Sequence, residues 1–393
     1  MPVSKKVGEA MTRSSWIRRM FEEGETLRAD GKGTVCDFSL GNPCLEPPGE
    51  FTKRLAELVL SPPPGVHRYM ANIGHESTRR AVAAYVRDEF KVAVTHDHVV
   101  MTVGAGGGCN VALKAVLDPG DEVIVLTPFF VEYAFYIDNH GGTMVRVPAG
   151  DDFGIDHEAI ARAITARTKA MIINSPNNPT GAVYSRESLG RLAALLREKG
   201  VEMGRTIYLI SDEPYRKIFY DTQHCPGALD VYEHSIMITS HSKDLGLAGE
   251  RIGWIVVHPE ADDAESIHGA TAFLNRTLGF VNAPSLMQKA VETCLKASVD
   301  IEWYRRKRDL LYERLTAFGY ELVKPGGAFY VFPKAPGGDD VAFCQLMLKR
   351  HRVLVVPGSG FGAPGFFRLS YCVEDSVVEA ALPAFEQAIK EFK

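Results

Sequence analysis

Residues 235–253 read SIMITSHSKDLGLAGERIG, and the rest of the chain is best interpreted outward from this stretch. Its first part, 235–240, is apolar enough to predict a buried strand, and it leads directly into Ser242 and Lys243, with Arg251 further on. A lysine amine can form a Schiff base with an aldehyde, while hydroxyl and guanidinium groups nearby can bind a phosphate on the same molecule. Lys243 is therefore a candidate covalent anchor for an aldehyde that carries a phosphate.

On both sides of this stretch, short apolar runs alternate with amphipathic segments. The runs are apolar nearly throughout, which is typical of strands buried on both faces. The seven predicted strands are 99–103, 122–127, 143–148, 169–174, 207–211, 235–240 and 251–257. The predicted helices between them are 76–90, 106–117, 130–140, 156–166 and 186–199. This alternation predicts an α/β fold with a seven-stranded, mainly parallel sheet covered by helices.

The pattern changes after about residue 290. Helical signals dominate 283–318 and return at 374–391, and shorter strands are predicted at 328–332, 353–356 and 366–369. We therefore expect a second, smaller α/β domain. The predicted organisation is an N-terminal arm that packs with the small domain, a large domain and a small C-terminal domain, at residues 1–47, 48–290 and 291–393.

Composition excludes several classes of protein. The net charge is −5, with 44 basic and 49 acidic residues, so neither nucleic acid nor an anionic membrane is an expected partner. Seven dispersed cysteines favour reduced thiols and a cytoplasmic location over a disulfide framework. No secretory signal and no apolar run long enough to span a membrane is evident in the sequence.

Loops at the carboxyl ends of parallel strands are where such sheets bind ligands. Residues 104–108 read GAGGG, between a predicted strand and a predicted helix. Glycines let the backbone approach a ligand closely, and the amides at a helix N-terminus favour an anion, so this loop is suited to bind a phosphate. A dinucleotide-binding turn would need glycine at the position of Cys109. A tight strand-to-helix turn without a ligand is the plain alternative.

Two further loops carry polar residues after apolar strands. Residues 174–181 read NSPNNPTG, in which prolines fix the backbone and present asparagine side chains rigidly, although a simple turn is the alternative. Asp212 follows the strand at 207–211, where a buried carboxylate is costly unless it has a partner. An ionised Asp212 can hold a protonated pyridine nitrogen and make that ring an electron sink, or it can cap the next helix.

Two other positions are candidates for ligand contacts. Arg368 lies in the apolar run 366–370, where its guanidinium can bind a carboxylate with two hydrogen bonds or can face solvent on an edge strand. Phe130 can stack on a flat ring, although most phenylalanines belong to the core. The twelve histidines have no metal-like spacing, and no metal site is predicted.

Taken together, these motifs resemble the class I and II aminotransferases of the aspartate aminotransferase fold (fold type I), which use pyridoxal 5′-phosphate (PLP). The resemblance covers about residues 38–372. Each motif alone is common, but their joint occurrence in this order is specific. In chain order they are Gly41-Asn-Pro, Tyr69-x4-Gly74-x4-Arg79, the turn at 104–108, Asn-Asn-Pro-Thr-Gly at 177–181, Asp212-x-x-Tyr215, Ser240-x-Ser242-Lys243-x7-Arg251, Pro-Gly-Gly-Ala-Phe-Tyr at 325–330, Pro-Gly-Ser-x-Phe-Gly at 357–362 and Phe-Arg-Leu-Ser at 367–370.

Carried over residue by residue, the resemblance implies a set of catalytic and binding roles. Lys243 would hold PLP as a Schiff base, Asp212 would pair with the pyridine nitrogen, and Tyr215 would complete the catalytic group. The ring would also be contacted by Phe130, which stacks on it, and by Asn178 and Tyr215 at its hydroxyl oxygen. The phosphate ligands would be Ala105, Gly106, Ser240, Ser242, Arg251 and, reaching into the neighbouring subunit, Tyr69. The substrate would be bound by Gly41, Asn178 and Arg368, the last at its α-carboxylate.

The implied reaction moves the amino group of an L-amino acid to a 2-oxo acid, with 2-oxoglutarate expected, in ping-pong order. The implied partners are these small molecules and a second copy of the chain, in a homodimer with shared sites. The donor stays open between aspartate and an aromatic or other apolar amino acid. A dicarboxylate needs a further cation, which 106–108 lacks, so that Arg13 or Arg18 would have to supply it.

Two other readings share the same lysine. A PLP-dependent C–S β-lyase would use the same Lys243 and Asp212, and it would differ in releasing pyruvate and ammonia without an oxo acid acceptor. A PLP-binding regulator without turnover would need a DNA-binding module, but the residues before Leu40 have neither a basic surplus nor a helix-turn-helix pattern.

Overall fold

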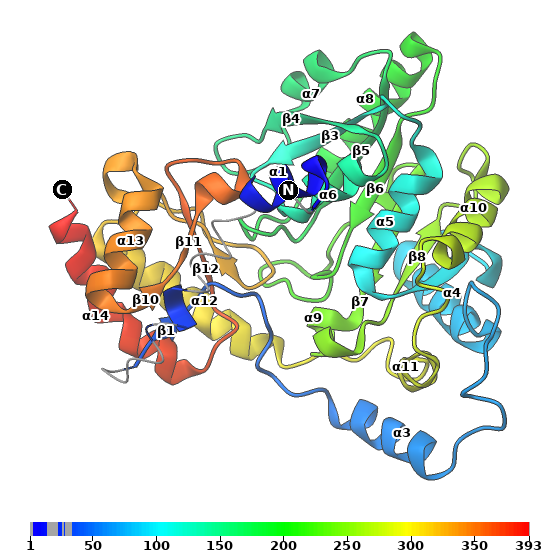
Figure 1. The fold of residues 1–393 in the computed structure, drawn as a ribbon, viewed down its shortest axis with the longest axis horizontal. Helices are drawn as coiled ribbons and strands as arrows, with labels where there is room; N and C mark the ends of the chain where they lie inside the picture. Colours follow the sequence, from blue (N-terminus) through cyan, green and yellow to red (C-terminus); the bar gives the residue numbers. More distant parts are fainter. Residues whose placement is uncertain (1–2, 14–22, 26, 28–33, 393) are drawn as a thin grey trace.

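A seven-stranded sheet forms the larger part of the molecule (Figure 1). The computed structural model describes residues 3–13, 23–25, 27 and 34–392. The strand order is β2-β8-β7-β6-β5-β3-β4, and β8 runs antiparallel to both its neighbours while all other pairs are parallel. The strands are β2 (Val99–Thr102), β3 (Glu122–Thr127), β4 (Thr143–Pro148), β5 (Thr168–Asn174), β6 (Tyr208–Asp212), β7 (Ser235–Ser240) and β8 (Gly253–Val257). The predicted mainly parallel sheet is confirmed.

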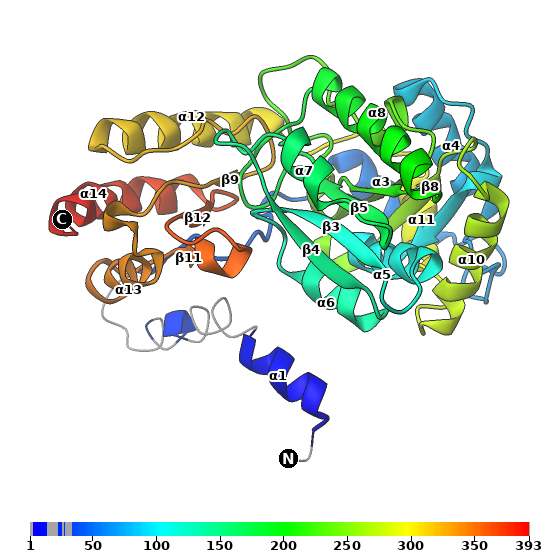
Figure 2. The same ribbon diagram turned by 90° about the horizontal axis from the view of Figure 1, so that it is seen from above.

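Helices cover both faces of this sheet (Figure 2). Along β3, Val123 and Val125 pack with α5, α6 and α10, whereas Ile124 and Leu126 pack with α7 and α8, because successive side chains of a strand point to opposite faces. Burial on both faces explains why the inner strands are apolar nearly throughout, whereas the edge strand β4 is largely exposed and carries Arg146. The helices around the sheet are α3 (Gly49–Leu60), α4 (Glu76–Phe90), α5 (Gly104–Val116), α6 (Glu132–Asn139), α7 (His157–Ala163), α8 (Arg186–Met203), α9 (His241–Asp244), α10 (Ala264–Thr277) and α11 (Ser285–Val291).

The smaller part of the molecule lies at the opposite end from this sheet (Figure 2). It contains a three-stranded antiparallel sheet in the order β11-β12-β9, packed with α12, α13 and α14. Its elements are β9 (Tyr330–Val331), β10 (Val353–Leu354), β11 (Val356–Pro357), β12 (Phe367–Ser370), α12 (Ile301–Phe318), α13 (Asp340–His351) and α14 (Asp375–Glu391). The expected smaller α/β unit is present.

The N-terminal segment reaches this smaller part. Its strand β1 (Cys36–Asp37) pairs in parallel with β10, and Phe38 packs in the same apolar cluster as α14. Further towards the N-terminus, α1 (Lys5–Arg13) contacts α6 through an ion pair of 3.0 Å between Lys6 and Asp138. The boundaries drawn at residues 47 and 290 stay predictions.

Among the described elements, five helices lie where no helix was predicted. They are α1, α3, α9, α10 and α13, and α3 falls within a Pro/Gly-rich stretch. Pro48 directly precedes α3 and Pro62 follows it closely, so these prolines flank the helix, where they are tolerated, and do not interrupt it. Short 3-10 helices are η1 (His96–His98), η2 (Ala228–Asp230), η3 (Ala248–Glu250), η4 (Pro336–Gly338) and η5 (Gly358–Phe361). Of the helices in the described ranges, none is long and apolar enough to cross a membrane.

Candidate active site

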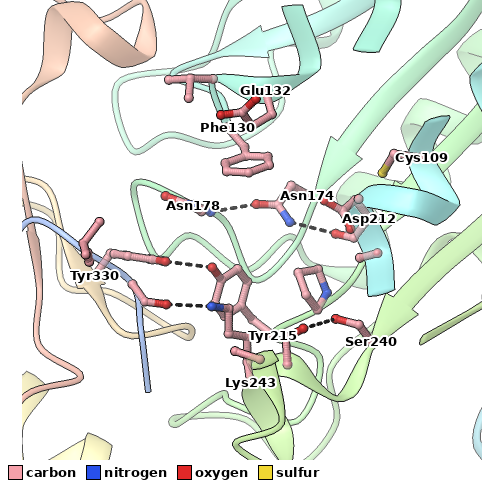
Figure 3. Close-up of a pocket in the computed structure, with 18 of the residues that line it drawn as sticks. Cys109, Phe130, Glu132, Asn174, Asn178, Asp212, Tyr215, Ser240, Lys243 and Tyr330 are labelled. Atoms are coloured by element: carbon pink, nitrogen blue, oxygen red, sulfur yellow. Dashed lines mark hydrogen bonds between the residues drawn. The ribbon is translucent and has the colours of Figure 1, made fainter. Parts of the chain in front are cut away.

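A cavity of about 350 Å³ opens at the carboxyl ends of β5, β6 and β7, which is where open α/β sheets bind ligands (Figure 3). Its volume lies within the range of small-molecule sites. Polar side chains from the large sheet meet others from β12 and the N-terminal segment there. The predicted site residues that line it are Gly41, Ala105, Gly106, Phe130, Asn178, Asp212, Tyr215, Ser240, Ser242, Lys243, Arg251 and Arg368.

Lys243 projects into this cavity from α9, the single helical turn that follows β7 (Figure 3). Its Nζ donates a hydrogen bond of 2.6 Å to the carbonyl oxygen of Gly41. Burial lowers the pKa of Lys243 to about 8, and the charges of Arg251 and Arg368 act in the same direction. The amine therefore loses its proton far more readily than an exposed lysine, as a nucleophile or a general base requires.

The turn that carries Lys243 is fixed by a buried ion-pair network. Asp244 lies 2.9 Å from Nζ of Lys217 and 3.1 Å from Nδ1 of His241. Lys217 also donates hydrogen bonds to the carbonyl oxygens of Leu295 and Ala297. Burial opposes the ionisation of Asp244, but Lys217 and His241 outweigh it and lower its pKa to about 2. Asp244 therefore stays ionised at neutral pH, and the network holds α9 against the segment that follows α11.

Asp212 ends β6 and presents one occupied and one free carboxylate oxygen. Its Oδ2 accepts a hydrogen bond of 2.6 Å from the hydroxyl of Tyr133, while Oδ1 is buried and has no hydrogen-bond partner among the described residues. Burial raises the pKa of Asp212 to about 7, although the hydrogen bond from Tyr133 acts in the opposite direction. A buried oxygen without a partner is costly, so this atom is set to accept a hydrogen bond from a ligand.

Three further hydrogen bonds connect residues around the cavity. The hydroxyls of Tyr215 and Tyr330 lie 2.7 Å apart, and the side-chain oxygen of Asn174 accepts a bond of 2.7 Å from the backbone N–H of Asn178 (Figure 3). Asn174 also donates to the carbonyl oxygen of Asp212 at 2.7 Å. The asparagine loop is therefore tied to β6 and does more than reverse the chain.

Arg368 brings a buried guanidinium from β12 to the cavity. It donates one hydrogen bond of 2.9 Å to the side-chain oxygen of Asn178 and another of 2.5 Å to the carbonyl oxygen of Ser39. Its guanidinium carbon lies 4.8 Å from the ring centre of Tyr330 and 4.6 Å from that of Phe361. Within the described part of the chain no carboxylate forms an ion pair with it. A buried cation held in this way is suited to bind the carboxylate of a ligand.

The opposite end of the cavity is built to receive an anion. The N-terminus of α5 presents Ala105 and Gly106, and Ser240 donates a hydrogen bond of 3.1 Å to the hydroxyl of Ser242. Gly104 has a φ of +67°, and a Cβ atom at this position would lie 2.8 Å from Nη2 of Arg251. The positive φ favours glycine at this position, and a Cβ atom there would displace the guanidinium from the start of the helix. Helix amides, hydroxyls and a cation together form a phosphate-binding arrangement.

Comparisons with known proteins agree on one family. The family model for aminotransferase class I and II matches residues 34–385. The chain belongs to the class I and II aminotransferases. The aspartate/prephenate aminotransferase of Thermus thermophilus is 36% identical over 372 residues, which is 92% of this chain and 93% of that protein. The crystal structure of an amino transferase from Eubacterium rectale has a TM-score of 0.95 and 40% sequence identity, and covers 100% of both chains.

The protein is therefore an enzyme that transfers amino groups, and its cofactor is PLP. The described residues fit the cofactor at three points. The unpartnered Oδ1 of Asp212 is suited to a protonated ring nitrogen, the amine of Lys243 to an aldehyde, and the end of the cavity beside Arg251 to a phosphate. Membership of this family favours an aminotransferase over the two alternatives, a C–S β-lyase and a PLP-binding regulator.

Several residues of the aminotransferase cavity were not predicted as site residues. They include Glu132, Tyr136, Tyr330 and Phe361, which line it, and Tyr133, which lies outside the lining and donates a hydrogen bond to Asp212. Tyr330 and Phe361 were part of quoted motifs, which was a usable signal, whereas nothing in the local sequence marks the residues of α6.

Two predictions lie outside the cavity or outside the described residues. Tyr69 does not line the cavity of its own chain, and 92% of its surface is exposed. Arg18 lies outside the described residues, and the side chain of Arg13 is not described either.

Proposed function

We propose that Lys243 is both the covalent anchor of PLP and the base that moves the substrate's Cα proton. The observation that carries this proposal is the depressed pKa of about 8 of an amine buried in the cavity with Asp212, Arg251 and Arg368 around it. When bound, PLP supplies an electron sink for the bond that breaks at Cα. Lys243, released from the cofactor when the substrate's amino group takes its place, would then accept the proton from Cα and deliver it back to the cofactor.

Asp212 and Tyr215 are proposed to orient the cofactor ring. The free Oδ1 of Asp212 accepts a hydrogen bond from the ring nitrogen and favours its protonated form. Tyr215 and Asn178 donate hydrogen bonds to the ring hydroxyl oxygen, and Phe130 stacks on one face of the ring. All these side chains line the cavity, which supports the assignment.

The phosphate and the substrate carboxylate are proposed to bind at opposite ends of the cavity. The phosphate ligands are Ala105, Gly106, Ser240, Ser242 and Arg251. Arg368 binds the α-carboxylate with two hydrogen bonds, supported by Asn178, and Gly41 lies beside it. A Cβ atom on Gly41 would lie 2.1 Å from the hydroxyl of Tyr330, so only glycine leaves this end of the cavity free.

The proposed reaction is ping-pong transfer from an L-amino acid to a 2-oxo acid. Relatives named as aspartate, aspartate/prephenate and aromatic-amino-acid aminotransferases support a donor of the aspartate or aromatic type. For the acceptor, 2-oxoglutarate is the first choice to test, beside pyruvate and oxaloacetate. Pyruvate lacks the distal carboxylate that the other two carry, so the comparison isolates that group.

We also propose a homodimer in which each cavity receives Tyr69 from the neighbouring subunit. The side chain of Tyr69 is 92% exposed on its own chain, so it is free to reach a cavity of a second subunit, which supports this role. The cytoplasm is the proposed location. Free thiols at all seven cysteines, most of them buried, support a reducing compartment.

Reduction with borohydride tests the anchor directly. Purified protein loaded with PLP is reduced and digested, and the peptide that carries the cofactor mass is identified by mass spectrometry. We expect the label on Lys243 and none on the Lys243→Ala variant. Amino transfer is then measured for the twenty amino acids with each acceptor. A Lys243→Ala protein that transfers amino groups at the wild-type rate would contradict the proposal.

A further inference from the structure

The start of α6 forms one wall of the cavity. Phe130, Glu132 and Tyr136 all line it, and Glu132 and Tyr136 are one helical turn apart, on the same face of α6. The hydroxyl of Tyr136 lies 3.0 Å from the point that a Cβ atom on Gly106 would occupy, so this wall stands directly beside the start of α5. Figure 3 shows Glu132 next to Phe130 at the rim of the cavity.

Among the described residues, Glu132 is the only charged residue of the cavity lining that has no role in the proposed reaction. Among the described residues, the cavity's other charged side chains are Lys243, Arg251, Arg368 and Asp212, each with a proposed ligand contact. Glu132 is half-buried, and no hydrogen bond or ion pair joins its carboxylate to another described residue. Burial raises its pKa, as expected for a carboxylate that lacks a partner.

We propose that Glu132 sets the substrate class of this aminotransferase: it disfavours a side chain that ends in a carboxylate and favours one that ends in a hydrogen-bond donor. The inference rests on the proposed function, because it takes the cavity as the place where the substrate side chain lies. Within that function it selects against aspartate as the donor and against 2-oxoglutarate and oxaloacetate as acceptors, since all three carry a distal carboxylate. Two carboxylates in a half-buried wall repel each other, whereas an amide, hydroxyl or ammonium group donates to Glu132.

The position of Glu132 in the helix also has a purely structural explanation. An acidic residue in the first turn of a helix is stabilised by the helix dipole, with no ligand involved. That explanation predicts an effect of Glu132 on stability alone. A difference in affinity between two ligands therefore distinguishes the two roles. Succinate and its monoamide, succinamate, are suitable ligands, because they differ only in the distal group.

The experiment measures the Kd of succinate and of succinamate for the PLP-loaded enzyme by isothermal titration calorimetry. We expect the wild type to bind succinamate about tenfold more tightly than succinate, as for one repulsive contact between like charges. The isosteric variant Glu132→Gln is expected to bring this ratio close to one. Glu132→Lys is expected to invert it, so the test does not depend on one variant. Glu379→Gln, an exposed change on α14, is the control and is expected to keep the wild-type ratio.

The proposal is overturned if the ratio in Glu132→Gln equals that of the wild type, or if the wild type prefers succinate.

A measurement of turnover distinguishes a failure of this inference from a failure of the proposed function. Asparagine and aspartate are compared as donors with pyruvate as acceptor, and the ratio of their kcat/KM values is expected to fall about tenfold in Glu132→Gln. If the variants change the binding ratio but neither donor is turned over, the proposed transfer reaction is contradicted. The proposed role of Glu132 in ligand discrimination is then still supported.

Discussion

At the scale of single residues, Tyr133 determines how Asp212 meets its ligand. It occupies Oδ2 and leaves Oδ1 free, and its ring packs edge-to-face against Phe130 at 5.5 Å. We expect Tyr133→Phe to keep the ring contact, to raise the pKa of Asp212 further and to weaken PLP binding about tenfold, since a hydrogen bond to a charged group is lost. Titration of the PLP-free protein with cofactor, followed by fluorescence quenching, measures this.

The matched control for Tyr133 is Tyr232→Phe. Tyr232 is also buried and donates a hydrogen bond of 2.8 Å, to the carbonyl oxygen of Ile207, outside the cavity. Both variants lose one buried hydrogen bond, so both are expected to lose stability. An equal loss of PLP affinity in the two variants would show that Tyr133 acts through general stability and not through Asp212.

Lys243 carries a cost in stability that function imposes. Its pKa is about 8 in the folded protein against 10.5 for an ordinary lysine, so the unfolded chain binds more protons between these values and stability rises with pH there. Without PLP, Lys243→Met is expected to be more stable than the wild type at pH 7, by on the order of 3 kcal/mol. Urea unfolding from pH 7 to 10.5 tests this, with the exposed Lys349→Met as control.

The expected signature for Lys243 is the pH dependence of that difference. The advantage of Lys243→Met should be complete below pH 8 and should shrink as the pH rises towards 10.5. A difference that stays constant across this window would mean that the charge of the amine is not its cause.

At the scale of elements, the ion-pair network around Asp244 secures the short helix α9. Removing one partner of a buried ion pair leaves the other without compensation and costs about 3 kcal/mol or more. Asp244→Asn is therefore expected to lower the thermal midpoint clearly. Glu202→Gln, which breaks the exposed pair with Lys199 on α8, is expected to leave the thermal midpoint nearly unchanged. Similar losses in both variants, measured by calorimetry, would contradict the role of the network.

The elements also show how far the sequence alone reaches. The strands of the large sheet were predicted to within a few residues, because burial makes most of them apolar nearly throughout. Asp212 and Lys243 stood out as polar residues that end or follow such strands. Tyr133 and Glu132 did not stand out, because an aromatic or acidic residue in an amphipathic helix is equally typical of a core or a solvated face. Only the packing of α6 on the sheet gives these two residues their roles.

At the scale of the whole molecule, the proposed dimer makes a prediction about mixed subunits. If Tyr69 acts in the neighbouring subunit, a heterodimer of Tyr69→Phe and Lys243→Ala chains contains one cavity with both native residues and one with neither. Two weakly active proteins should then regain up to about a quarter of the wild-type activity when equal amounts are unfolded, mixed and refolded, since half of the dimers are mixed. Activity no higher than the mean of the two parents would contradict a shared site.

The course of the chain between β7 and β8 has a consequence for the two cations that it carries. These strands are antiparallel, with Ser240 opposite Gly253, so the connection that carries Lys243 and Arg251 begins and ends at the same rung of the ladder. An insertion or deletion inside it would displace both cations at once, whereas one elsewhere in the chain would leave their spacing unchanged. The proposed anchor and the proposed phosphate ligand are thus positioned by one connection, whereas Asp212 and Arg368 lie on separate strands.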